Sequence, residues 1–335
     1  MKHQDLPSLF ESFKNLKVLI IGDVMVDSYI YGSVDRISPE APVPIMHVQK
    51  RESRLGGAAN VALNIQSLGA VPILCSIIGD DIPAATFRSL LKNRGMSDEG
   101  IINSSKRSTT VKNRVISGGH HLIRIDEEEN ASLEQADKNE LIGHIQNLTQ
   151  KCDVVIMEDY DKGTLDAEVI SATVEYANKQ GIPVAVDPKK NNFLAYKGAT
   201  LFKPNLKELS EGLNLSVDPR EVSQISDAVA QLQMKFDFDL ALITLSEHGI
   251  FFKSAREELK LPAHIRSISD VSGAGDTVIS IASLCLALDL PAVILTELAN
   301  LGGGIVCEYS GVVPIDRSRL IDEASENELI QSCFK

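Results

Sequence analysis

The chain has 335 residues, of which 44% are hydrophobic, and a formal net charge of −13 at pH 7. This composition suits a globular protein with a sizeable core, and no stretch approaches the ~20 uncharged apolar residues of a membrane span. The negative charge, the 5% content of aromatic residues and the absence of tryptophan argue against a nucleic-acid partner, which normally meets a basic face.

The N-terminal residues, the cysteines and the histidines indicate no export signal, disulfide or metal site. The first residues lack the apolar core of a secretory signal, so we expect a cytoplasmic protein. The five cysteines are scattered and form no CxxC pair, which is typical of buried, reduced thiols. The seven histidines show no metal-ligand spacing.

Short apolar runs alternate with amphipathic stretches along most of the chain. In chain order, the pattern predicts strands at residues 17–21, 73–78, 153–157, 183–186, 200–203 and 240–245. It predicts helices at residues 58–68, 82–92, 166–179, from 205 onward, 222–234, 276–288 and 291–309. Such alternation indicates a mostly parallel sheet with helices on both faces. The helix at 276–288 is apolar on nearly every side, so we expect it in the interior.

Two segments break this alternation. Residues 31–52 contain three prolines and end in alternating residues, which is typical of edge strands and loops. Residues 109–126 read as two strands joined at Gly118-Gly119 in a tight hairpin turn. Together they predict a small antiparallel sheet, which is either a lid over a ligand or an edge extension. No repeat or long linker divides the chain, so we expect one domain over residues 1–335.

The segment DVSGAGDT at residues 270–277 is the strongest chemical signal. The amides of Gly273, Ala274 and Gly275 at the start of the buried helix form a candidate anion site. Asp276 beside them can accept a proton, and phosphoryl transfer needs both a base on the attacking hydroxyl and donors for the migrating charge. Aspartate is also a favoured N-cap, so a purely structural role stays open.

Two further segments follow predicted strands. In KPNLKE, Asn205 and Glu208 lie one helical turn apart, where they either share a hydrated cation or form a capping box. Asp27 follows the first strand, and Gly57 and Asn60 begin the next helix. These residues are expected at the ligand crevice of an α/β sheet, although such positions often hold turn or cap residues. Neither GxxxxGK[ST] nor GxGxxG occurs, which disfavours P-loop and dinucleotide folds.

Taken together, these segments resemble the ribokinase-like (PfkB-type) carbohydrate kinases. DVSGAGDT is similar to the C-terminal signature of that family, GGAAN to its N-terminal signature and residues 205–208 to its NxxE element. The resemblance covers residues 17–314. It implies an α/β, ribokinase-like fold in which a central, mostly parallel sheet is flanked by helices and carries a small antiparallel β lid. It also implies ATP and Mg²⁺ as cofactors, and a homodimer paired through the lid.

The resemblance assigns roles to individual residues. Asp276 would take the proton, with the amides of residues 273–275 as the anion hole. The sugar ring would be held by Asp27, Gly57 and Asn60. The nucleotide, its phosphates and its Mg²⁺ would be held by Asn205, Glu208, Lys189, Lys203, Thr244, Ser246, Gly249 and Asn300. Of these, Asn205 and Glu208 would bind the metal, through water.

Longer stretches narrow the resemblance to the D-glycero-β-D-manno-heptose 7-phosphate kinases. Residues 22–48, which include SPEAPVP, and residues 158–165 are similar to that subfamily. Glu158 departs from it, because serine is more usual there. A 7-phosphate requires cations, and the candidates are Arg36, Lys112, Arg114, Arg124 and Lys162. The alternatives are a kinase for a fructose or tagatose phosphate or a free hexose, and a non-catalytic sugar or nucleotide sensor.

Overall fold

The first strand of the core is β1 (Lys17–Gly22), in which every residue after Lys17 is buried. Val18 and Ile20 pack into one apolar cluster and Leu19 and Ile21 into another, because successive side chains of a strand point to opposite faces. The strand is therefore covered on both sides, as a buried parallel strand requires. This computed structural model describes residues 5–334.

The main sheet has nine strands in the order β13-β12-β11-β10-β9-β8-β1-β4-β5. Neighbours are parallel except at β12 and β13, so the predicted mostly parallel sheet is confirmed. The bounds of the other strands are β4 (Val71–Gly79), β5 (Gly100–Ser104), β8 (Val154–Glu158), β9 (Val184–Asp187), β10 (Ala199–Phe202), β11 (Phe238–Thr244), β12 (Ile250–Lys253) and β13 (Glu258–Leu261).

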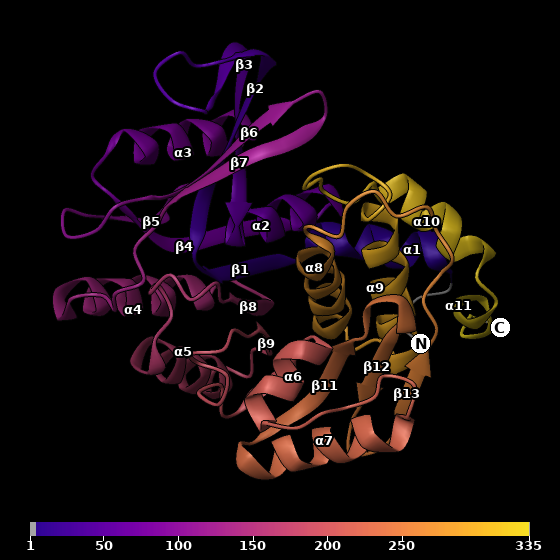
Figure 1. The fold of residues 1–335 in the computed structure, drawn as a ribbon. Coiled ribbons are helices and arrows are strands. Elements are labelled where there is room, and N and C mark those ends of the chain that lie inside the picture. Colours follow the sequence, from indigo (N-terminus) through magenta and orange to yellow (C-terminus); the bar gives the residue numbers. More distant parts are fainter. Residues whose placement is uncertain (1–4, 335) are drawn as a thin grey trace.

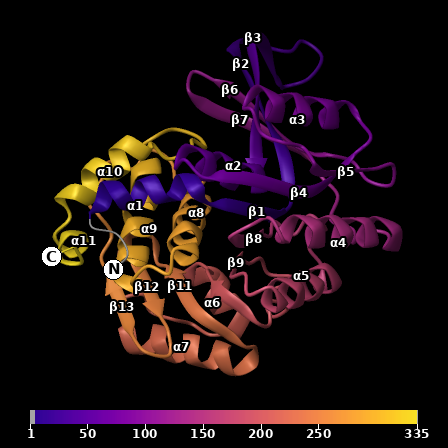
Figure 2. The same ribbon diagram turned by 180° about the vertical axis from the view of Figure 1, so that it is seen from behind.

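Helices cover both faces of this sheet (Figures 1 and 2). One face packs against α1 (Leu6–Ser12), α2 (Ala58–Ser67), α3 (Ile82–Asn93), α8 (Ala274–Ala287), α9 (Ala292–Val306), α10 (Arg317–Glu326) and α11 (Glu328–Ser332). The other packs against α4 (Gln135–Thr149), α5 (Ala167–Lys179), α6 (Leu206–Leu213) and α7 (Val222–Lys235). In the described part of the chain, no helix combines the length and apolarity that crossing a membrane would require.

A second, four-stranded sheet projects from the body beside α3 (Figure 1). Its order is β3-β2-β6-β7, with β2 (Val24–Ile37), β3 (Pro44–Gly57), β6 (Thr110–Ser117) and β7 (His120–Glu127). The predicted hairpin turn is confirmed, since Gly118 and Gly119 have φ of 56° and 81°, values that tight hairpin turns favour.

The prediction that this sheet is wholly antiparallel is wrong, because β2 and β6 pair in parallel. The chain reaches β6 only after passing through β4, α3 and β5, and such long crossovers are what parallel neighbours require. The strands are also longer than predicted. Because β2 starts at Val24, Asp27 belongs to the second sheet and not to the end of β1.

Candidate active site

Helix α8 begins beside the carboxyl ends of β8 and β9. Gly273 is its N-cap residue, with φ of 81°, a backbone conformation that glycine adopts without strain. The turn before it is held by Asp270, whose carboxylate accepts the amide and hydroxyl of Ser272 at 3.0 and 2.8 Å. Of the three predicted anion-site amides, that of Ala274 donates to the Val271 carbonyl at 3.3 Å.

Asp276 lies in the first turn of α8 and does not cap it. Its Oδ2 accepts a hydrogen bond from Asn60 Nδ2 at 2.6 Å, and its Oδ1 accepts one from the Tyr160 hydroxyl at 2.9 Å. Burial raises the pKa of the Asp276 carboxyl, Asp187 raises it further, and the bond from Asn60 opposes the shift. A buried carboxylate with a raised pKa is better matched to accepting a proton from an alcohol near neutral pH.

Three acidic side chains meet at this point. One carboxylate oxygen from each of Glu158, Asp187 and Asp276 lies within 4.8 Å of the other two. Burial, together with the charges of Asp187 and Asp276, raises the pKa of Glu158 well above its usual value, and Glu158 Oε2 is buried without a partner. Glu158 therefore holds its proton more tightly than an exposed glutamate, which limits the repulsion that a third carboxylate adds.

A buried lysine balances the cluster. Lys203 Nζ lies 2.8 Å from Asp187 Oδ2, and the two side chains are only 2% and 5% exposed. A β-carbon placed on Gly275 would lie 3.5 Å from both of these atoms. The start of α8, the base candidate and an ammonium group are thus adjacent, so that negative charge arriving at the helix start would meet both amides and a cation.

In the structure, Asn205 and Glu208 of the KPNLKE segment form a capping box at the start of α6. Asn205 accepts the amide of Glu208 at 2.9 Å, and Glu208 Oε2 accepts the amide of Asn205 at 2.9 Å. The other oxygen of Glu208 binds Lys189 Nζ at 2.5 Å. Both side chains are therefore already hydrogen-bonded, within the cap and to Lys189.

The other predicted nucleotide residues gather around the end of β11. Thr244 bridges to Asn205. Ser246 begins the short 3₁₀ turn η2 (Ser246–His248) and Gly249 follows it, and both residues have positive φ. Asn300 on α9 donates to the Pro262 carbonyl at 2.8 Å. Thr244, Ser246 and Gly249 lie at the same end of the sheet as Lys203, one strand further along.

The predicted sugar residues divide into two groups. Asn60 contacts Asp276, and Gly57 is the N-cap of α2 with φ of 61°. Asp27 lies on β2, where its Oδ1 accepts a hydrogen bond from Arg114 Nη1 at 2.5 Å. A sugar hydroxyl that donates to the Asp27 carboxylate would therefore share that carboxylate with Arg114.

Four of the five predicted phosphate-binding cations already have carboxylate partners. Arg114 pairs with Asp27, Arg124 with Asp126, Lys162 with Glu128, and Lys112 with both Asp126 and Glu128. Arg36 is exposed near the distal end of β2.

Sequence reasoning missed Asp23, the single residue between β1 and β2. Its buried carboxylate accepts the amides of Tyr160 and Lys162 through Oδ2, at 2.9 and 3.0 Å, and that of Thr164 through Oδ1 at 2.9 Å. Asp23 thereby fixes the loop after β8 that carries the Tyr160 hydroxyl to Asp276. Sequence reasoning also missed roles for Asp187, the last residue of β9, and for Tyr160, two residues after β8. The signals for them were these positions at strand ends and, for Tyr160, the stretch at residues 158–165.

The sequence model of the family described as "pfkB family carbohydrate kinase" matches residues 15–317 of this chain. The chain belongs to the pfkB family of carbohydrate kinases. As a member of this family it is an ATP-dependent sugar kinase, a phosphotransferase, and the predicted family is confirmed.

Curated relatives agree with this family, and solved structures agree with the fold. The chain is 36% identical over 324 residues to the bifunctional protein HldE of Citrifermentans bemidjiense, covering 96% of this kinase and 66% of that protein. It therefore spans about two-thirds of that relative. The fold is similar to Escherichia coli phosphofructokinase-2 in complex with fructose-6-phosphate, with a TM-score of 0.74, 18% identity, and 92% and 99% of the two chains covered. It is also similar to Arabidopsis thaliana ribokinase complexed with ribose and ATP, with a TM-score of 0.70, 15% identity, and 91% and 98% covered.

Proposed function

We propose that this kinase transfers the γ-phosphoryl group of ATP to the anomeric hydroxyl of D-glycero-β-D-manno-heptose 7-phosphate, giving the 1,7-bisphosphate. The observation that carries the proposal is the Asp276 carboxylate, held by Asn60 and Tyr160 at the start of α8. The choice of sugar is supported by the resemblance of residues 22–48 and 158–165 to heptose 7-phosphate kinases, and by the similarity to HldE proteins.

In the proposed reaction, Asp276 takes the hydroxyl proton as the sugar oxygen attacks the γ-phosphorus. The bond to the bridging oxygen breaks, and ADP leaves with that electron pair. The amides at residues 273–275 and the Lys203 ammonium would stabilise the charge on the migrating phosphoryl group. The second sheet would act as a lid, excluding water and limiting ATP hydrolysis.

The nucleotide substrate would be MgATP. Its phosphates would lie between the start of α8 and the end of β11, near Lys189, Thr244 and Gly249. Glu208 and Asn205 would hold the metal through water, since both side chains are used in the cap of α6. The magnesium ion neutralises phosphate charge during transfer.

A substrate panel tests the proposal. Heptose 7-phosphate, free heptose, fructose 6-phosphate, tagatose 6-phosphate and ribose are each incubated with MgATP, and ADP release is measured. We expect kcat/KM for heptose 7-phosphate to be the highest of the panel, and to exceed that of free heptose and ribose by at least about 10²-fold, since a site built to bind a phosphate rejects sugars that lack it. A higher value for another sugar would reassign the substrate, and absence of turnover with all of them would place the substrate outside the panel.

We also propose that two copies pair through the second sheet. Ile123 and Ile125 point to the same face of edge strand β7 and are 55% and 49% exposed, and such a patch marks an interaction surface. Analytical ultracentrifugation should give twice the chain mass of 36.4 kDa, and the variant I123E/I125E should give the monomer. A wild-type monomer at micromolar concentration would contradict the pairing.

A further inference from the structure

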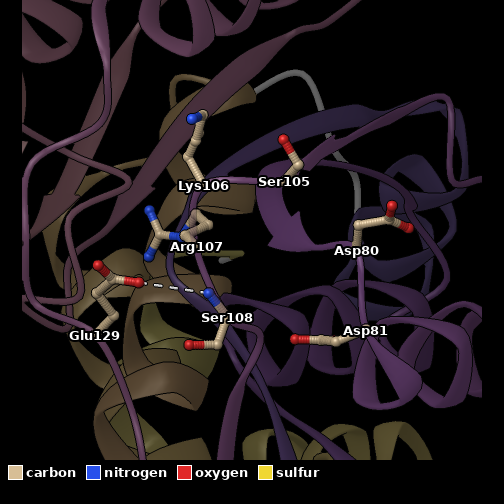
Figure 3. A pocket seen from close by; sticks show the side chains of 7 residues that line it. All are labelled: Asp80, Asp81, Ser105, Lys106, Arg107, Ser108 and Glu129. Carbon is tan, nitrogen blue, oxygen red and sulfur yellow. Dashed lines mark hydrogen bonds between the residues drawn. The ribbon is translucent and has the colours of Figure 1, made fainter.

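The loop that follows β8, residues 159–164, is held in place from two sides. The buried carboxylate of Asp23 accepts its amides at residues 160, 162 and 164, at 2.9, 3.0 and 2.9 Å. Arg107, which lines a cavity beyond the carboxyl ends of β4 and β5 (Figure 3), donates from Nη2 to the Lys162 carbonyl at 2.5 Å. Because these bonds hold the backbone of the loop, the side chains that it carries start from fixed positions.

Tyr160 is the residue of this loop whose side chain contacts the first turn of α8. Its hydroxyl lies 2.9 Å from Asp276 Oδ1. Lys189 Nζ lies over its ring, 5.8 Å from the centroid, a distance at which a cation is attracted to an aromatic face. Both parts of the side chain thus have a partner, and the hydroxyl is directed at the candidate base.

The Tyr160 hydroxyl acts as a hydrogen-bond donor. Burial and the negative charge of Asp276 raise the pKa of Tyr160 well above its usual value, so the phenol keeps its proton near neutral pH. An ionised carboxylate can only accept hydrogen bonds. Among the described residues, Asp276 is the one hydrogen-bond partner of this hydroxyl. The hydroxyl therefore acts on Asp276 alone.

The surroundings of Asp276 disfavour a negative charge. Its side chain is buried, and Glu158 on β8 and Asp187 on β9 each bring a carboxylate oxygen within 4.8 Å of it. Helix α9, which packs against α8, presents Gly302 and Gly303 and so adds no polar side chain at this contact. A carboxyl group in such surroundings keeps its proton unless donors or cations favour the ionised form. A carboxyl group that keeps its proton cannot act as a base.

Three groups favour the ionised form of Asp276. Asn60 on α2 donates to Oδ2 at 2.6 Å, and Tyr160 donates to Oδ1 at 2.9 Å. Burial raises the pKa of Asp276, whereas the bonds from these two donors and the charge of Lys203 oppose this rise. Lys203 is itself in direct contact with Asp187, at 2.8 Å. The two donors are therefore the groups that act on the Asp276 carboxylate directly, one on each oxygen.

We propose that Tyr160 is a positioning residue, which orients the Asp276 carboxylate and keeps it ionised so that it can take the proton of the acceptor hydroxyl. In the transfer, that proton moves from the sugar oxygen to a lone pair of the carboxylate that neither Tyr160 nor Asn60 uses. Tyr160 keeps its own proton throughout. The inference rests on the proposed function for the role of Asp276 as the base, and it does not depend on which sugar is phosphorylated.

The test compares the pH dependence of kcat/KM in the wild type and in Tyr160→Phe, with the sugar that has the highest kcat/KM in the substrate panel. Phenylalanine keeps the ring beside Lys189 and removes only the hydroxyl. With one donor lost, the ionised form of Asp276 is less favoured, so the acidic limb of the profile moves to higher pH. We expect a move of about one pH unit, as for loss of one hydrogen bond to a charged group. The KM for ATP should stay unchanged.

Tyr196→Phe is the matched control. Tyr196 is buried, and its hydroxyl donates to Asp159 Oδ2 at 2.7 Å, at the start of the same loop. This variant therefore loses a bond between a tyrosine and a carboxylate in the loop but none at Asp276. We expect a lower melting temperature with the acidic limb in its wild-type position. An unmoved limb in Tyr160→Phe, or an equal move in both variants, would overturn the proposal.

A double variant gives the second test, because Tyr160 is proposed to act only through Asp276. At a pH on the acidic limb of the wild type, Tyr160→Phe should lower kcat/KM about 10-fold. Added to Asp276→Asn, the same change should alter the residual kcat/KM by less than about 2-fold. An equal loss in both backgrounds would mean that Tyr160 acts on a substrate directly, which would overturn the proposal alone. Near-normal turnover of Asp276→Asn would instead remove the base, and with it the proposed function.

Discussion

Asp276→Asn is expected to lower kcat by at least ~10²-fold, because the variant loses the group that removes the hydroxyl proton. The structure strengthens this prediction, since Asp276 does not cap α8 and both its oxygens accept hydrogen bonds from outside the helix. Asparagine keeps the volume and one acceptor oxygen. Binding of ATP, measured by calorimetry, should therefore remain close to that of the wild type.

Asp166→Asn provides the control for this measurement. Asp166 caps α5 by accepting the amides of Glu168 and Val169, and asparagine is an equally good N-cap. We expect that variant to keep a near-normal kcat. Near-normal turnover of Asp276→Asn would remove Asp276 from the role of base, and unchanged kcat with a raised KM would indicate a binding role instead.

Lys203→Met is expected to lower the free energy of unfolding by about 3–5 kcal/mol, the usual result of removing one partner of a buried ion pair. Lys203 and Asp187 are almost fully buried at 2.8 Å from each other. Without the ammonium, Asp187 would face Glu158 and Asp276 with no cation in contact. Urea denaturation followed by circular dichroism measures the change.

The loss should depend on pH. A carboxyl whose folded-state pKa is raised, as for Glu158, contributes stability that is present below its unfolded pKa and lost as the pH rises through the folded pKa. The charge of Lys203 lowers the pKa of Glu158 and of Asp276. Removing Lys203 therefore raises both pKa values further, and the variant should be less destabilised at pH 5 than at pH 8. Equal destabilisation at both values would contradict a charge-based cause.

Two comparisons separate this pair from ordinary ion pairs. The double variant Lys203→Met/Asp187→Asn should recover part of the stability, because neither charge is then left alone. Lys207→Met removes an exposed lysine 3.8 Å from Glu211 and should change stability by less than about 0.5 kcal/mol. If Lys203→Met is as stable as the wild type, the pair does not balance the acidic cluster.

Much of the fold could be predicted from local pattern. Buried runs such as residues 17–21 became strands, and the all-apolar segment at 276–288 became the interior helix α8. The glycine pair at 118–119 gave the predicted turn. Each of these features depends on neighbours in the sequence, which is why periodicity and turn chemistry were sufficient. The parallel pairing of β2 with β6 was missed because it depends on the path of the chain between them.

By itself, the sequence determined the class of fold and the family, since these rest on contiguous patterns and on motifs in a fixed order, and it predicted Asp276 as the base. Only the tertiary structure decided what surrounds each charge. Asn60 and Asp276 are 216 residues apart, yet their side chains touch. Four of the five predicted phosphate-binding cations are paired with carboxylates, and all of these but Arg124 with carboxylates that lie far from them in the sequence or on a neighbouring strand. Partner and burial set the free energy of a charge, and both are properties of the folded chain.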